Sequence, residues 1–187
     1  MPISNDTFKE ISTVVRGGFD DRDRIIEIFC EEMYAPGELD PVEVEAAVDA
    51  AIKAHEAEKV SWPDVTDCDR LDAVFQALRP LGVLALHNAG YTQSDGYDDF
   101  RQAYSEAPDH DRIIGYCYYH GQDLEGAVEG RGLCLAFGPA NPKEEDTRGP
   151  EVGRTIVDQL RAAGFEVQWD GTFNTRILIP TFDWKRR

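Results

Sequence analysis

The sequence predicts an α+β protein with α/β-like character. A helical segment is expected to precede a mixed, largely parallel five-stranded sheet with packed helices and a C-terminal β-hairpin. Two observations predict this class. Residues 4–60 carry apolar side chains at helical spacing. Farther along, a pattern of helix, glycine and strand recurs three times, with Gly82, Gly132 and Gly164 as the glycines. A glycine directly after a helix adopts the left-handed conformation that turns the chain into a strand, so helices and strands should alternate.

Three helices are expected within residues 1–60. The first runs from about Asn5 to Arg16 and ends at a glycine pair, and the second follows the candidate N-caps Asp20 and Asp21. The third has the clearest start signal, because Asp40 can cap a helix whose first residue is proline and whose Glu43 completes a capping box.

The hinge between two domains is expected at Val60–Asp64, where Trp62 precedes a proline and is therefore extended. This interpretation divides the chain into a three-helix segment, residues 1–60, and a sheet domain, residues 61–187.

Helices and strands of the sheet domain follow from apolar runs bounded by glycine and proline. Helices are expected after Thr66 or Asp67, between Tyr97 and Ala107, and after Gly149. The strands are expected at Val83–Leu86, Ile113–Tyr119 and Leu133–Phe137, and in a hairpin of Phe165–Trp169 with Arg176–Ile179.

The charge of the chain excludes some classes of partner. With 36 acidic and 19 basic residues, the net charge is −17. Nucleic acids and anionic membrane surfaces are disfavoured as partners, since their binders present lysine and arginine. A strongly acidic surface suits solubility or the attraction of a basic protein partner. Both interpretations stay open at this point.

A cytoplasmic location is expected. No window approaches the roughly 18 apolar residues of a membrane span, and the N-terminal residues lack the apolar core of a signal peptide. The four cysteines are far apart and form no C-x-x-C pair, so neither a zinc site nor a dense disulfide framework is expected.

The candidate functional site is the loop that begins at His87, where an apolar strand stops and hydrogen-bonding side chains follow. If the intervening helix is a crossover, the strands ending at Leu86 and Tyr119 are parallel neighbours, and His87 and His120 lie at one sheet edge. The strand ending at Phe137 is expected to bring its following loop to that edge too. Ligands tend to bind outside strand carboxyl ends. The candidate ligand-binding residues are therefore His87, Asn88, Tyr91, Gln93, Asp95, His120 and Asp123.

Three of these residues, His87, Asp95 and His120, are candidate catalytic residues, because imidazoles with a nearby carboxylate can transfer protons near neutral pH. The alternative is structural: Asn88, Ser94 and Asp95 are also residues that turn a loop and cap a helix. No cofactor and no metal ion is expected, since the sequence contains no GxGxxG, P-loop, HExxH or G-x-S-x-G motif.

Three stretches carry a resemblance to a known family. They are Trp62–Asp72 (WPDVTDCDRLD), His87–Gly96 (HNAGYTQSDG) and Tyr119–Leu124 (YHGQDL). The chain resembles, over nearly its whole length, an uncharacterised bacterial family known only as a domain of unknown function, which implies no activity. More loosely, its strand–helix repeats are similar to ferredoxin-like regulators such as the ribonuclease E inhibitors, which implies a regulatory role by analogy of fold.

Two functions follow as hypotheses. The favoured one is an acidic regulatory protein, of the inhibitor or immunity type, that binds a basic or nucleic-acid-handling protein. The alternative is a small-molecule-binding protein or acid–base enzyme that uses His87, Asp95 and His120. Self-association through the N-terminal helices is a further expectation.

Overall fold

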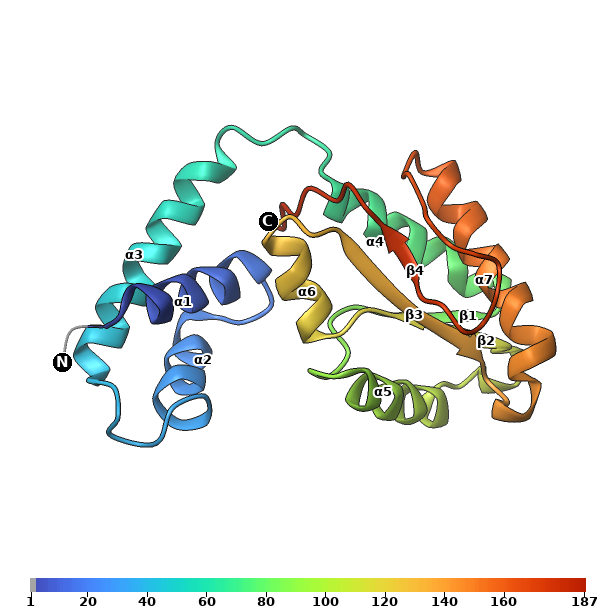
Figure 1. Cartoon of the computed structure of the whole chain (residues 1–187), viewed down its shortest axis with the longest axis horizontal. Helices are drawn as coiled ribbons and strands as arrows, with labels where there is room; N and C mark the ends of the chain where they lie inside the picture. The colour runs from blue at the N-terminus through green and yellow to red at the C-terminus, as the bar shows by residue number, and fades with distance from the viewer. Residues whose placement is uncertain (1–2) are drawn as a thin grey trace. The chain divides into compact units, whose positions relative to one another are not determined.

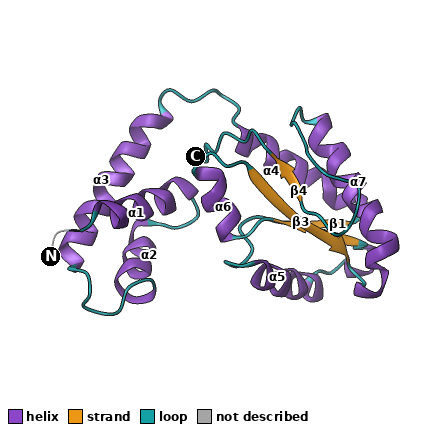
Figure 2. Ribbon diagram, viewed as in Figure 1, coloured by secondary structure: helices purple, strands orange, loops and turns teal. Residues whose placement is uncertain are grey.

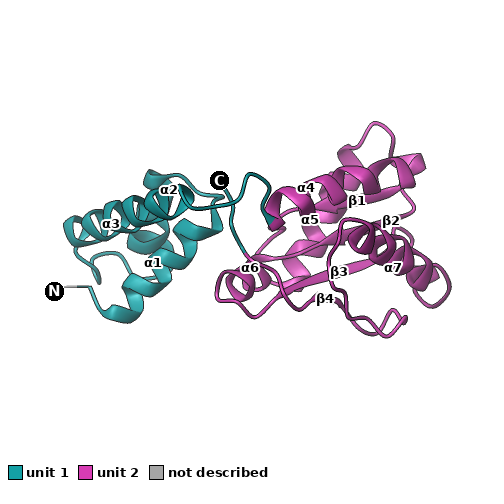
Figure 3. Ribbon diagram, turned by 90° about the horizontal axis from the view of Figure 1, so that it is seen from above, with its two compact units in different colours: residues 1–66, 184–187 teal, residues 67–183 magenta. Residues whose placement is uncertain are grey.

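The computed structural model describes residues 3–187, which fall into two compact units (Figure 3). The first unit comprises the residues up to Thr66 together with Trp184–Arg187, and the second comprises Asp67–Asp183. The chain therefore leaves the first unit once and returns to it at its last four residues.

The first unit contains three α-helices among its described residues: α1 (Asn5–Gly17), α2 (Arg22–Glu27) and α3 (Pro41–Lys59) (Figure 1). A π-helical turn, Ile28–Glu32, continues α2. The side chains of Ser4, Asp21 and Asp40 cap the three helices by accepting hydrogen bonds from backbone N–H groups of the first turn. The buried core of the unit consists of Ile11, Val15, Ile25, Phe29, Val44, Ala47, Val48 and Ala51.

The second unit builds a four-stranded sheet, flanked by helices (Figure 2). The strands lie in the order β1-β2-β3-β4, with β1 parallel to β2 and the other two pairs antiparallel. The elements follow one another as α4 (Asp67–Leu78), β1 (Val83–Leu86), α5 (Gln93–Glu106), β2 (Gly115–Tyr118), α6 (Gly121–Val128), β3 (Leu133–Pro139), α7 (Glu145–Ala162) and β4 (Ile177–Ile179).

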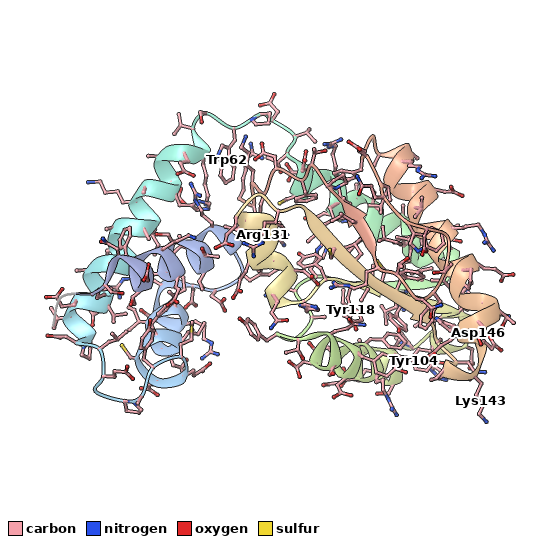
Figure 4. The ribbon with its side chains drawn as sticks, viewed as in Figure 1. Trp62, Tyr104, Tyr118, Arg131, Lys143 and Asp146 are labelled. Carbon is pink, nitrogen blue, oxygen red and sulfur yellow. The ribbon has the colours of Figure 1, made fainter. Side chains whose placement is uncertain are left out.

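Helices cover both faces of this sheet (Figure 1). Helix α5 packs on the face that presents Leu84, Leu86, Tyr116 and Tyr118, while α4 contacts β1 and α7 contacts β3. Tyr104 of α5 and Tyr118 of β2 belong to the aromatic layer on the α5 side (Figure 4). Among residues 3–187, no helix combines the length and apolar character that a membrane crossing requires.

The α+β class is confirmed, whereas the prediction of a largely parallel sheet is wrong. One strand pair is parallel and two are antiparallel. The physical reason is the connection between β2 and β3. Helix α6 has eight residues, about 12 Å of length, and Gly130 and Gly132 follow it with positive φ angles. After this short connection the chain is still at the carboxyl end of β2, so β3 runs antiparallel to β2.

The predicted fifth strand and C-terminal hairpin are also wrong. Residues 165–169 form one isolated bridge, in which Gln168 and Leu178 exchange backbone hydrogen bonds of 2.8 and 3.0 Å. Side-chain contacts hold this segment instead: the Trp169 ring packs on Phe137, and its indole N–H donates to the Thr172 carbonyl at 2.9 Å. The following loop closes on Asp170, which accepts hydrogen bonds from Thr172 and Thr175 rather than continuing a ladder.

Candidate functional site

The parallel pairing of β1 and β2 places His87 and His120 just after neighbouring strand ends. Backbone hydrogen bonds extend this pairing into the loops. Ala89 N–H donates to the Tyr119 carbonyl at 2.9 Å, and Gly121 N–H donates to the Gly90 carbonyl at 2.9 Å. The loop after β1 is therefore held against the start of α6.

The loop after Phe137 does not reach this edge, contrary to the sequence-based expectation. Because β3 is antiparallel to β2, Pro139 at its carboxyl end lies opposite Gly115 at the amino end of β2. Its amino-terminal half lies at the edge of the histidines instead, together with the start of β4.

His87 connects α4 to the strand ends. Its Nδ1 lies 3.0 Å from the Tyr119 hydroxyl and its Nε2 lies 3.3 Å from Asp72 Oδ1. The ring also packs on Phe75, with centroids 4.4 Å apart, and the side chain is 26% exposed. Both ring nitrogens have partners, and a neutral imidazole offers only one acceptor nitrogen. Proton abstraction by His87 would therefore require one of these contacts to break.

His120 belongs to a second, buried cluster. Its Nε2 lies 3.1 Å from Asp123 Oδ2, and the residue is only 4% exposed. Asp123 also forms an ion pair with Arg176, whose guanidinium donates to the Cys134 carbonyl at 3.3 Å. Burial lowers the pKa of His120, while the Asp123 carboxylate opposes that shift. The cluster connects α6 to β3 and to the residue before β4.

The two histidines thus lie at the same edge with different partners. Arg176, which completes the His120 cluster, was not predicted as a site residue. It lies 53 residues from Asp123 along the chain, and only the fold brings the two together. Asp72 was not among the predicted site residues, and no local signal indicated its contact with His87.

Asp95, Tyr91 and Gln93 have structural roles at the start of α5. Asp95 and Thr92 form a capping box, in which the Thr92 N–H and hydroxyl each donate to Asp95 Oδ2 at 2.9 Å. The backbone hydrogen bond from Thr92 is the main cause that lowers the pKa of Asp95. The Tyr91 hydroxyl donates to Glu125 at 3.2 Å, and the Gln93 carbonyl accepts from Tyr118 at 2.7 Å.

A surface hollow of about 280 Å³ lies where the end of β1 meets α5. Its α5 side consists of Asp99 together with Gln102, Ala103 and Glu106, which lie three, four and seven positions after Asp99 and so share one helix face with it. The other side consists of Leu86, His87, Asn88 and Ala89. Two of the predicted ligand-binding residues, His87 and Asn88, therefore line this hollow.

Asn88 is the conformationally unusual residue of the hollow. Its φ angle is +46°, in the left-handed region, and its Oδ1 is buried without a hydrogen-bond partner among residues 3–187. A buried acceptor without a partner costs roughly 1–3 kcal/mol. The turn after β1 therefore keeps one buried acceptor that no described residue satisfies.

The chemistry of the hollow matches a cationic group on an apolar stem. Leu86, Ala89 and Ala103 contribute apolar surface, and the carboxylates of Asp99 and Glu106 contribute negative charge. Lysine and arginine side chains have this amphipathic character. Within the described part of the chain, no group of three or more His, Cys, Asp and Glu side chains is positioned to hold a metal ion.

Comparison with known proteins finds one relationship. Residues 3–187 match a family described as a domain of unknown function, DUF6891. No curated protein and no solved structure matches the chain.

Proposed function

The chain belongs to the DUF6891 family, whose function is unknown, and we propose that it acts as an acidic regulatory protein, of the inhibitor or immunity type, that binds a basic protein partner. The observation that carries this proposal is the hollow beside β1, which is lined both by Asp99 and Glu106 of α5 and by the apolar residues Leu86, Ala89 and Ala103. A lysine or arginine side chain of the partner occupies it, with its stem on Leu86 and Ala89.

The arrangement of the three candidate catalytic side chains favours binding over acid–base catalysis. Asp95 caps α5, His120 is buried against Asp123, and His87 is held between Asp72 and Tyr119. A general base needs a lone pair within reach of its substrate. Each of these groups already has a structural partner at the position where it would act.

The charge distribution supports a basic partner. The chain carries a net charge of −17, and α5 contributes Asp95, Asp98, Asp99 and Glu106 against one arginine, Arg101. Such a field attracts a basic surface over distances of about a Debye length and increases the association rate at low salt. The proposal includes a cytoplasmic location, which suits the four free cysteines.

The experiment compares two charge-neutralising double variants. Asp99→Asn/Glu106→Gln neutralises the hollow, and Glu151→Gln/Asp158→Asn makes the same change on exposed positions of α7. The probe is a blocked hexalysine peptide, titrated into ¹⁵N-labelled protein at low salt. We expect amide shifts around Asn88 and Gln102 and at least a fivefold weaker affinity in the hollow variant than in the α7 variant. Equal affinities in the two variants contradict the proposal.

A further inference from the structure

We propose that the basic partner binds as an extended segment that pairs with the free edge of β1 and places a lysine or arginine side chain in the hollow. This inference rests on the proposed function and specifies its binding mode. It follows from the position of β1, from the face on which the hollow lies and from the charge around it.

Strand β1 is at the end of the sheet, since β2 is its only strand neighbour among residues 3–187. The backbone groups on the other side of an edge strand are available to a further strand. Edge strands are commonly protected by lysine, proline or a bulge. The sequence of β1, Val-Leu-Ala-Leu, contains none of these, and its last three residues are only partly buried.

The hollow lies on the correct face for such a strand. Leu84 and Leu86 pack with the aromatic cluster under α5, so their side chains point to the α5 side of the sheet. Side chains of an added strand alternate between the two faces in the same way. A residue beside Leu86 on the α5 side therefore lies over the hollow, next to the carboxylates of Asp99 and Glu106.

The acidic charge beside the edge of β1 favours a basic peptide over a second copy of the chain. A second copy of the chain, paired through its own β1, would bring another acidic α5 next to Asp99 and Glu106, which like-charge repulsion opposes. A basic extended peptide brings the opposite charge. Its main-chain hydrogen bonds supply affinity, and its alternate side chains supply specificity.

The test uses three versions of one peptide, Ac-Val-Lys-Val-Lys-Val-Lys-Val-NH2. One version is unmodified, one is N-methylated at the lysines and one is N-methylated at the inner valines. In an extended strand, successive N–H groups point to opposite edges, so each modification blocks one edge only. We expect one methylated version to bind at least tenfold more weakly than the unmodified peptide, and the other to bind within about twofold of it.

The outcomes separate this inference from the proposed function. If both methylated versions bind alike, whether strongly or weakly, strand pairing is overturned. If binding is then still weakened by Asp99→Asn/Glu106→Gln, the proposed function stands without it. An unmodified peptide that does not bind, or binds the neutralised hollow equally well, overturns both. If the protein dimerises without peptide and Leu86→Lys abolishes the dimer, the edge of β1 binds a second copy of the chain and the inference is overturned.

Discussion

The rings of His55 and Trp62 pack edge to face, with centroids 5.3 Å apart, and the guanidinium of Arg187 lies 5.8 Å from the Trp62 ring centroid. The last four residues thus belong to the helical unit. Trp184 donates its indole N–H to the Arg16 carbonyl at 3.0 Å, and Arg186 lies over the Phe19 ring at 4.3 Å. The helical unit is therefore completed by residues more than 100 positions away along the chain.

The burial of His55 makes the stability of this unit depend on pH. The residue is 6% exposed, and burial is the main cause that lowers its pKa from the ordinary value of 6.5. The positive charges of Lys59 and Arg16 lower this pKa further. The carboxylates of Glu56 and Glu58 oppose the shift. The unfolded chain then binds more protons than the folded one below about pH 6.5, so the free energy of unfolding decreases as the pH falls through that range.

We expect His55→Phe to weaken this pH dependence, because phenylalanine keeps a ring on Trp62 and cannot be protonated. Hydrogen-exchange protection of α3 amides, measured from pH 8 to pH 5 and corrected for intrinsic rates, is the measurement. A variant whose protection decreases as steeply as that of the wild type would contradict the role of His55.

Replacing Trp184 tests whether the C-terminal residues hold the helical unit. Trp184→Phe removes the donor to the Arg16 carbonyl and should cost about 1 kcal/mol of local stability in α1, and Trp184→Ala should cost more. The matched control is Trp169→Phe, which removes an indole hydrogen bond of similar length in the other unit. Exchange protection of α1 should decrease in the first two variants only, and an equal response to the control would disprove the assignment.

Much of the fold was predictable because local signals agree with it. The N-caps, the apolar helix faces and the glycines before β1 and β3 all act within a few residues. The start of α5 was predicted four residues too late, because its capping box, Thr92 with Asp95, uses aspartate where glutamate is the usual signal. The direction of β3 depends on the length and packing of α6, which no periodicity in the sequence encodes.

The sequence predicted where the candidate site lies in the sheet, but not which residues contact one another there. The parallel order of β1 and β2 follows from a crossover helix, so the edge that carries His87 and His120 was inferred correctly. The partners of these histidines, Asp72 and Arg176, depend on tertiary packing. The acidic residues of α5 can be read from the sequence, but the position of Asp99 and Glu106 beside the end of β1 cannot.

Asp123 is expected to be essential for the stability of the sheet unit. Asp123→Asn leaves the Arg176 guanidinium without its buried ionic partner and should cost about 2–3 kcal/mol, discounted for the partial exposure of Arg176. Thermal unfolding measures this effect, with Glu125→Gln as the control on the same helix, at a half-buried carboxylate that accepts a hydrogen bond from the neutral Tyr91 hydroxyl. Asp123→Leu/Arg176→Leu should be less destabilised than Asp123→Asn, since no unpaired charge remains. Equal losses for Asp123→Asn and Glu125→Gln would refute this interpretation.

Gly96 sets the distance between α5 and the sheet. A Cβ atom added at this glycine would lie 2.5 Å from Tyr118 Cε2 and 2.7 Å from the Ala89 carbonyl oxygen, and a backbone oxygen cannot move aside as a side chain can. Gly96→Ala should therefore push α5 away from the strand end and cost about 1–3 kcal/mol.

The matched control for Gly96→Ala is Gly126→Ala in α6, where the nearest atom outside the helix backbone, on the Arg131 side chain, is 3.7 Å from the added Cβ. Alanine is favoured over glycine inside a helix by roughly 0.5–1 kcal/mol, so this variant should be neutral or stabilised. Urea unfolding measures the difference. Because α5 carries the carboxylates of the hollow, Gly96→Ala should also weaken hexalysine binding while Gly126→Ala leaves it unchanged. Equal stability of the two variants would show that α5 does not depend on this close approach.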